Sequence, residues 1–123
     1  MKYLVTIYGN QAKWDAFPPE EWPTAIAKQE AFNNRYRETG ELIGAYGLAD
    51  AAAAQLVRRA EGLPVVTDGP YLETKEYIAS FYLLDCESLE RAQQIAADMP
   101  FADVEPVELW PILHESPANA ADV

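Results

Sequence analysis

The sequence has little cysteine and little histidine: Cys86 and His114 are the only residues of their kinds. A single cysteine excludes an intrachain disulfide and a metal cluster built from several thiolates of one chain. Cys86 is expected to be a buried, inert thiol rather than a reactive one, because no cationic residue or histidine stands beside it. His114 follows the last apolar segment, so we interpret it as a mobile terminal side chain rather than a catalytic or metal-binding one.

Basic residues and long apolar runs are also scarce. Nine Lys and Arg stand against 20 Asp and Glu, which gives a formal net charge of −11. This balance argues against direct binding of nucleic acid and against a polybasic membrane anchor. The first apolar run, residues 3–8, is too short for a signal-peptide core or a membrane span. We therefore expect a cytoplasmic protein without a membrane partner.

What the sequence does contain is enough apolar material for one core. The chain has 123 residues, and 50% of them are hydrophobic. We expect one domain over residues 1–115 and a flexible tail over residues 116–123. The patterns predict strands at residues 2–8, 41–48, 77–84 and 104–113, a hairpin at residues 55–59 and 63–67, and helices at residues 18–39 and 89–99.

The order of these elements indicates an α+β fold, a ferredoxin-like β-α-β/β-α-β sandwich with an inserted β-hairpin. Two helices cover only one face of such a sheet, with inner faces predicted at Trp22, Ala25, Ile26, Phe32 and Tyr36 and at Leu89, Ala92, Ile95, Ala96 and Met99. The strands nevertheless carry apolar residues on both faces. A second copy packed sheet to sheet would cover the other face, so we expect a homodimer.

One segment carries a family resemblance. Residues 68–76 read Asp-Gly-Pro-Tyr-Leu-Glu-Thr-Lys-Glu and are followed by a hydrophobic strand. This motif resembles the DGPF-domain branch of the YCII-related family, with Tyr71 where phenylalanine is usual, and the resemblance extends over most of residues 1–113. It implies a ferredoxin-like domain that forms a dimeric α/β barrel.

The resemblance implies two kinds of function. Some YCII-related proteins look like small-molecule enzymes that use a His–Asp pair, whereas DGPF members are often associated with extracytoplasmic-function sigma factors. The position of His114, after the last predicted strand, departs from the enzymatic pattern. The His–Asp pair therefore cannot be carried over to this chain.

Asp68 is the candidate catalytic residue. A carboxylate in a Gly-Pro turn at the edge of a cleft could act as a general base, or it could simply form the turn. Glu73 and Lys75 are candidate ligand-binding residues, with surface ion pairs as the alternative. Trp14, Tyr46 and Tyr82 are candidate pocket walls, with a place in the core or an interface as the alternative.

These residues leave two functions open. The first is a homodimer with a small-molecule pocket and acid–base activity centred on Asp68. The second is a non-enzymatic regulatory module that binds a transcription-linked protein through an acidic surface. The sequence has no phosphate-binding loop, dinucleotide fingerprint or zinc-ligand spacing, so we expect no cofactor and no metal.

Overall fold

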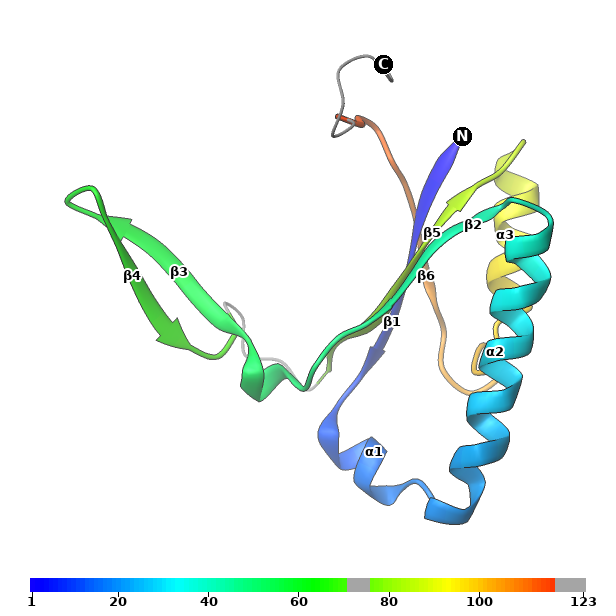
Figure 1. Ribbon diagram of the computed structural model, residues 1–123, viewed down its shortest axis with the longest axis horizontal. Coiled ribbons are helices and arrows are strands. Elements are labelled where there is room, and N and C mark those ends of the chain that lie inside the picture. Colours follow the sequence, from blue (N-terminus) through cyan, green and yellow to red (C-terminus); the bar gives the residue numbers. More distant parts are fainter. Residues whose placement is uncertain (71–75, 117–123) are drawn as a thin grey trace.

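The computed structural model describes residues 1–70 and 76–116, and its centre is a four-stranded antiparallel sheet (Figure 1). The strand order is β2-β5-β1-β6, formed by β1 (Lys2–Gly9), β2 (Leu42–Gly47), β5 (Tyr77–Asp85) and β6 (Glu108–Pro111). Helices α2 (Trp22–Glu38) and α3 (Leu89–Ala97) lie together on one face of this sheet. The predicted α+β ferredoxin-like sandwich is confirmed.

Shorter elements connect these layers. Helix α1 (Gln11–Ala16) and the 3-10 turn η1 (Pro19–Glu21) join β1 to α2, and the 3-10 turn η2 (Ala51–Ala53) follows β2. The inserted hairpin consists of β3 (Gln55–Ala60) and β4 (Leu63–Asp68), as the sequence predicts. No helix in the described part of the chain is long and apolar enough to cross a membrane.

Local sequence explains where the helices begin and end. The Ser88 side chain accepts a hydrogen bond from the Arg91 backbone N–H at 3.1 Å and caps α3. Asn10 caps α1 in the same way, accepting from the Lys13 N–H at 2.8 Å. After α2, Gly40 adopts a φ of 83°, which glycine tolerates better than other residues.

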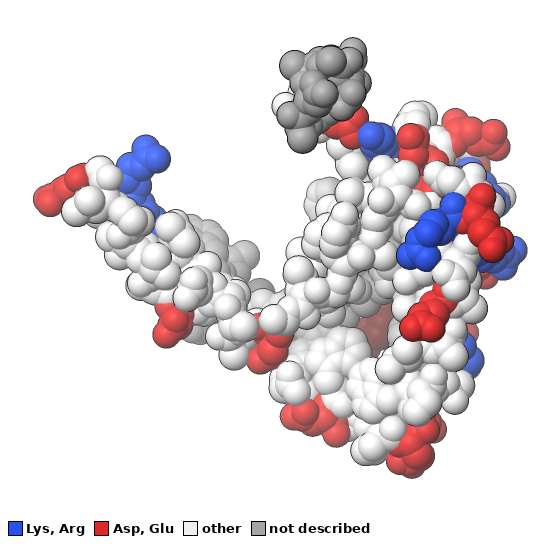
Figure 2. Space-filling view, viewed as in Figure 1, with Lys and Arg blue, Asp and Glu red and all other residues white. Residues whose placement is uncertain are grey.

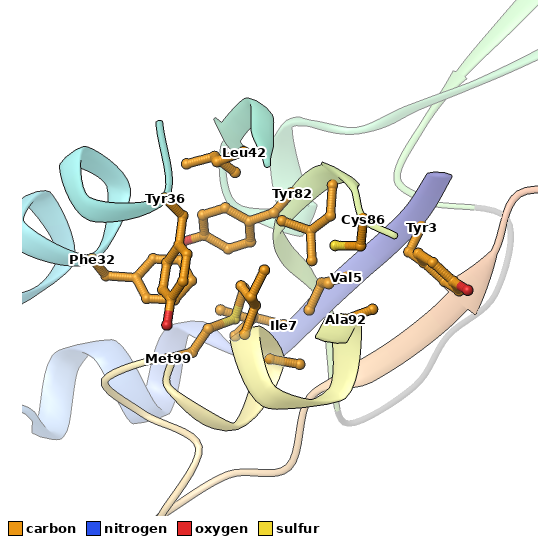
Figure 3. Close-up of a cluster of buried hydrophobic side chains, with 13 residues drawn as sticks. Tyr3, Val5, Ile7, Phe32, Tyr36, Leu42, Tyr82, Cys86, Ala92 and Met99 are labelled. Atoms are coloured by element: carbon orange, nitrogen blue, oxygen red, sulfur yellow. The ribbon is translucent and has the colours of Figure 1, made fainter. Parts of the chain in front are cut away.

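The hydrophobic core lies between the helices and the sheet (Figure 3). Tyr3, Val5, Leu84 and Ile95 are its largest fully buried side chains. Cys86 is also part of the core, which confirms that it is buried, and this burial raises the pKa of its thiol. The core therefore covers only the side of the sheet that faces the helices.

The other side of the sheet, here called the open face, is apolar and exposed. Its cross-strand pairs include Leu4 with Leu83 and Tyr46 with Phe81, and Trp110 lies opposite Leu4 on the edge strand. Tyr46 is 50% exposed and Trp110 52%, although both are large aromatic side chains. Within the described residues, no helix covers this face (Figure 1).

Several details differ from the sequence predictions, among them the unpredicted helix α1. Strand β6 covers only Glu108–Pro111 rather than residues 104–113, because Pro106 lacks the N–H that a ladder needs. Ile26 is 53% exposed and Leu89 43%, so neither belongs to the buried face predicted for its helix. The buried residues of α2, Phe32 and Tyr36, lie in its C-terminal half.

The hairpin projects away from the rest of the chain and is here called the arm (residues 55–68). Its strands pair only with each other, and Figure 1 shows its tip far from both helices. Glu61 and Gly62 form the tip with φ values of 52° and 78°, which suits the twist of a two-residue hairpin turn. The remaining described residues, 1–54 and 69–116 without the gap at 71–75, are called the body.

Candidate functional site

A cavity lies at one end of the sheet, next to the base of the arm. It has a volume of about 750 Å³ and is bounded by the end of β1, helix α1, the connection after β2 and the first residues of β5. Apolar side chains dominate its wall, among them Trp14, Leu48, Pro70 and Ile78. Cavities of this size and composition are typical of sites for small organic molecules.

Trp14 owes its place in this wall to Gly9. A Cβ atom on Gly9 would lie 2.8 Å from Cζ2 of the indole, so only glycine lets the ring approach the end of β1 so closely. The Trp14 ring also stands 6.1 Å from the Trp22 ring, and Phe17 lies 4.5 Å from Trp22. This aromatic group fixes the indole at the cavity edge.

The polar groups of the wall lie at or near the ends of helices and strands, and Tyr77 at the start of β5 is one of them. Asn10 caps α1, Gln11 donates a hydrogen bond to Asp15 at 2.8 Å, and Asp50 accepts from the Ala52 N–H at 3.4 Å as the cap of η2. Asp50 is thus the carboxylate that the described residues bring to this wall. Its capping role holds one side of the loop in place.

A second hollow of about 550 Å³ adjoins the first and shares the wall formed by Leu48, Asp50, Pro70 and Tyr77. It adds Tyr8 and Glu76. The nearby Lys13 pairs with Glu76 and, at 2.7 Å, with Glu105. These two carboxylates raise the pKa of Lys13 and compensate its charge. Nothing in the described wall therefore favours an anionic ligand.

A separate polar feature lies on the open face, at Glu108 of β6. Its carboxylate accepts hydrogen bonds from the Thr6 hydroxyl at 3.2 Å and the Trp110 indole N–H at 3.3 Å. A further hydrogen bond from Tyr8 is the main reason that the pKa of Glu108 is lowered. Glu108 is consequently an oriented, ionised group on an otherwise apolar surface.

The predicted site residues do not converge on one place. Trp14 lines the cavity. Tyr46 lies on the open face, stacked at 5.0 Å on Phe81, and Tyr82 lies in the core with its ring 6.1 Å from that of Phe32. Asp68 is exposed at the end of β4 and is not part of the described wall. Glu73 and Lys75 lie outside the described residues.

Sequence reasoning missed several wall residues, of which Asn10, Gln11, Asp50 and Tyr77 carry polar groups. A signal existed for Asn10 and Asp50, since asparagine and aspartate before short helical turns are typical capping residues. No sequence signal places Tyr77 there, because its position depends on where β5 begins relative to the loop after β2. Among the described residues, no group of three or more His, Cys, Asp and Glu side chains could hold a metal ion.

Comparisons with known proteins place this geometry in context. A family model described as the YCII-related domain matches residues 1–115. An uncharacterised protein of Rhizobium meliloti (strain 1021) is 35% identical over 103 residues, which is 84% of this chain and 83% of that protein. A solved structure of 5-chloro-2-hydroxyhydroquinone dehydrochlorinase from Burkholderia phenoliruptrix AC1100, in complex with 2,5-dihydroxybenzoquinone, gives a TM-score of 0.49 at 12% identity, covering 94% of this chain and 96% of that one.

Proposed function

The chain belongs to the family of proteins with a YCII-related domain, and we propose that it acts as a homodimer that binds a small, uncharged aromatic molecule. The single observation that carries this proposal is the cavity of about 750 Å³ beside Trp14. Its volume suits a small organic molecule, and an indole at the edge offers a flat face for stacking.

The composition of the wall supports an uncharged ligand. Leu48, Pro70 and Ile78 offer apolar contact, while Asn10 and Gln11 belong to the wall as polar groups for hydrogen bonding. Asp50 would repel an anion, and the charge of Lys13 is already compensated by two carboxylates. A hydroxylated aromatic ring fits these features better than an organic acid does.

Acid–base chemistry on the ligand is the second part of the proposal, with Asp68 as the candidate group. Asp68 is two residues before Pro70 in the cavity wall, and the intervening Gly69 N–H donates to the Ala54 carbonyl at 2.7 Å. Asp50, which lines the wall directly, is the matched comparison. Asp68→Asn should abolish turnover while ligand binding remains, whereas Asp50→Asn should weaken binding.

Ligand binding can be tested by a thermal-shift screen of neutral, hydroxylated one-ring and two-ring aromatic compounds. A compound at 100 times its Kd should add about 2.7 kcal/mol of stability, which is readily seen as a higher Tm. Trp14→Leu removes the stacking face, Gly9→Ala displaces it, and Ile26→Ala is an exposed control. The proposal fails if no compound raises the Tm, or if the Trp14→Leu protein responds as the wild type does.

The proposed dimer has support of its own in the open face. Leu4, Phe81 and Leu83 are only half-covered, and Tyr46 and Trp110 are exposed beside them. Packing this face against a second copy would remove a large apolar surface from water. Light scattering at micromolar concentration should give twice the protomer mass of 13.7 kDa, and a mass of 13.7 kDa would refute the dimer.

The alternative function is a regulatory module with a transcription-linked protein partner. The observation that favours it is the amount of apolar surface on the arm and the open face, which a protein partner could also cover. It predicts that Trp14→Leu leaves the biological activity intact while substitutions on the open face abolish it. The opposite pattern would favour the small-molecule function.

A further inference from the structure

The arm exposes apolar side chains along its whole length. The exposed fractions of four of them lie between 41% and 67%: Val57, Leu63, Val65 and Val66. Of the twelve strand residues, eleven are exposed and Leu56 is half-buried. Contiguous apolar surface of this kind marks a site of association.

The strand register shows that both faces of the arm carry apolar side chains. One face carries Leu56, Val65 and Leu63, since residues directly opposite each other in the ladder share a face. The other face carries Val57 paired with Val66. An isolated two-stranded hairpin is at best marginally stable in water, so the arm needs cover that the described body does not provide.

The position of the arm indicates which molecule supplies that cover. Figure 1 shows the arm and the helices on opposite sides of the sheet, so the arm extends past the same side as the open face. A second sheet stacked there would lie about 10 Å away, while an arm strand of six residues spans about 20 Å. The arm is therefore long enough to pass the second sheet and reach the body behind it.

The interface area also requires more than the open face. Four strands about 4.8 Å apart and about six residues long present only about 400 Å² on one face, half of the about 800 Å² per partner of a standard interface. Each face of the arm offers about 200 Å² by the same measure. In a mutual exchange each protomer would bury its open face, one face of its own arm, and the part of its body that lies under the partner's arm. These three surfaces together amount to about 800 Å² per protomer.

Charge supports the same arrangement. The arm contains two arginines, Arg58 and Arg59, and two carboxylates, Glu61 and Asp68, so its formal net charge is zero. The rest of the chain carries the whole charge of −11, and two such bodies repel each other. Figure 2 shows Lys/Arg and Asp/Glu colour side by side at the far end of the arm, and Asp/Glu colour near its base.

We propose that the arm of each protomer packs against the body of a second copy of this chain, with the arginine of the packed face, Arg58 or Arg59, directed at the acidic partner. This inference rests on the dimer of the proposed function and adds to it. The arms, rather than the open faces alone, make the dimer stable. Arm and open face then become buried in a single assembly step.

The test is the dimer dissociation constant by sedimentation velocity over a dilution series of the full chain. Val57→Asp combined with Val65→Asp places a charge on each face of the arm and should weaken the dimer at least tenfold. Arg58→Glu combined with Arg59→Glu should also weaken it, with most of the effect lost in high salt. Ile26→Asp, on the exposed side of α2 and 53% exposed, is the matched control and should leave the constant unchanged.

The outcomes separate the two proposals. A wild-type chain that is monomeric throughout the series contradicts both the dimer and the arm exchange. A wild-type dimer that the arm variants leave equally tight contradicts the arm exchange alone and leaves the dimer standing. Circular dichroism confirms that the body of each variant is folded, and Leu63→Ala is a milder arm variant that should weaken the dimer in the same direction.

Discussion

The body and the arm are built from similar residues but are stabilised in different ways. Leu84 in β5 is 0% exposed and packs inside the body, whereas Leu63 in β4 is 67% exposed. The body buries its apolar side chains against its own helices. Among the described residues the arm has no such layer, and a second copy of the chain is the cover that we propose for its apolar residues. The apolar residues of the body therefore stabilise the fold of the protomer, whereas those of the arm are available for assembly.

The largest expected effect comes from truncating the same residue type in the two regions. Leu84→Ala should lower the free energy of unfolding by about 3 kcal/mol, because it leaves a cavity in a packed core. Leu63→Ala should change the unfolding of the dilute monomer by less than about 0.5 kcal/mol. Urea denaturation of both variants at low concentration measures the contrast. Equal losses of unfolding free energy would show that Leu63 in the arm is packed as well as Leu84 in the body.

A partly buried hydrogen bond within the body should have a smaller effect. The Tyr36 hydroxyl donates to Asp98 at 2.7 Å and ties α2 to the end of α3. Tyr36→Phe should cost about 1 kcal/mol of stability, the usual net value of such a bond. Tyr46→Phe on the open face is the control and should change little. A neutral result for Tyr36→Phe would show that packing alone holds the helices together.

The smallest expected effect is a pH dependence that belongs to the body. Arg91 binds both carboxylate oxygens of Glu41, at 2.8 and 2.9 Å, and lowers the pKa of Glu41 below 4.5. A lowered folded pKa means that the pair stabilises the protein fully above pH 4.5 and that the contribution is lost as pH falls through the folded pKa.

Removing this carboxylate should therefore matter near neutral pH and not in acid. Glu41→Gln should reduce stability by about 0.5 kcal/mol at pH 7 and by less at pH 3. Glu38→Gln, which removes a carboxylate with no ion pair among the described residues, should change stability little at either pH. Thermal unfolding of the two variants at pH 7 and at pH 3 measures these differences in stability. A deficit of the same size at both would show that the charge of Glu41 is irrelevant.

The sequence predicted the fold well because local signals and the global fold agree. Residues 77–84 form a strand of the sheet, as their apolar pattern predicts. Ser88 and Gly40 stand at the ends of helices as expected. Helix α1 was missed because six residues carry too little periodicity to be recognised.

The candidate site was harder to predict because it depends on tertiary placement. Alternation shows that Tyr82 and Phe81 occupy different faces, but not which of them meets the helices. The structure buries Tyr82 and leaves Phe81 on the open face. Asp50 and Tyr77 reach one cavity only through the way two connections meet at the end of the sheet. Trp14 was identified because aromatic size alone is informative.

The central claim is that the arm is stabilised by a second copy and the body by itself. Hydrogen–deuterium exchange of the wild-type chain at high and low concentration tests it most directly. We expect amides of β3 and β4 to be protected at high concentration and to lose protection on dilution, while those of β1 and β5 stay protected. Arm amides that exchange equally fast at both concentrations, in a chain that light scattering shows to be dimeric, would contradict it.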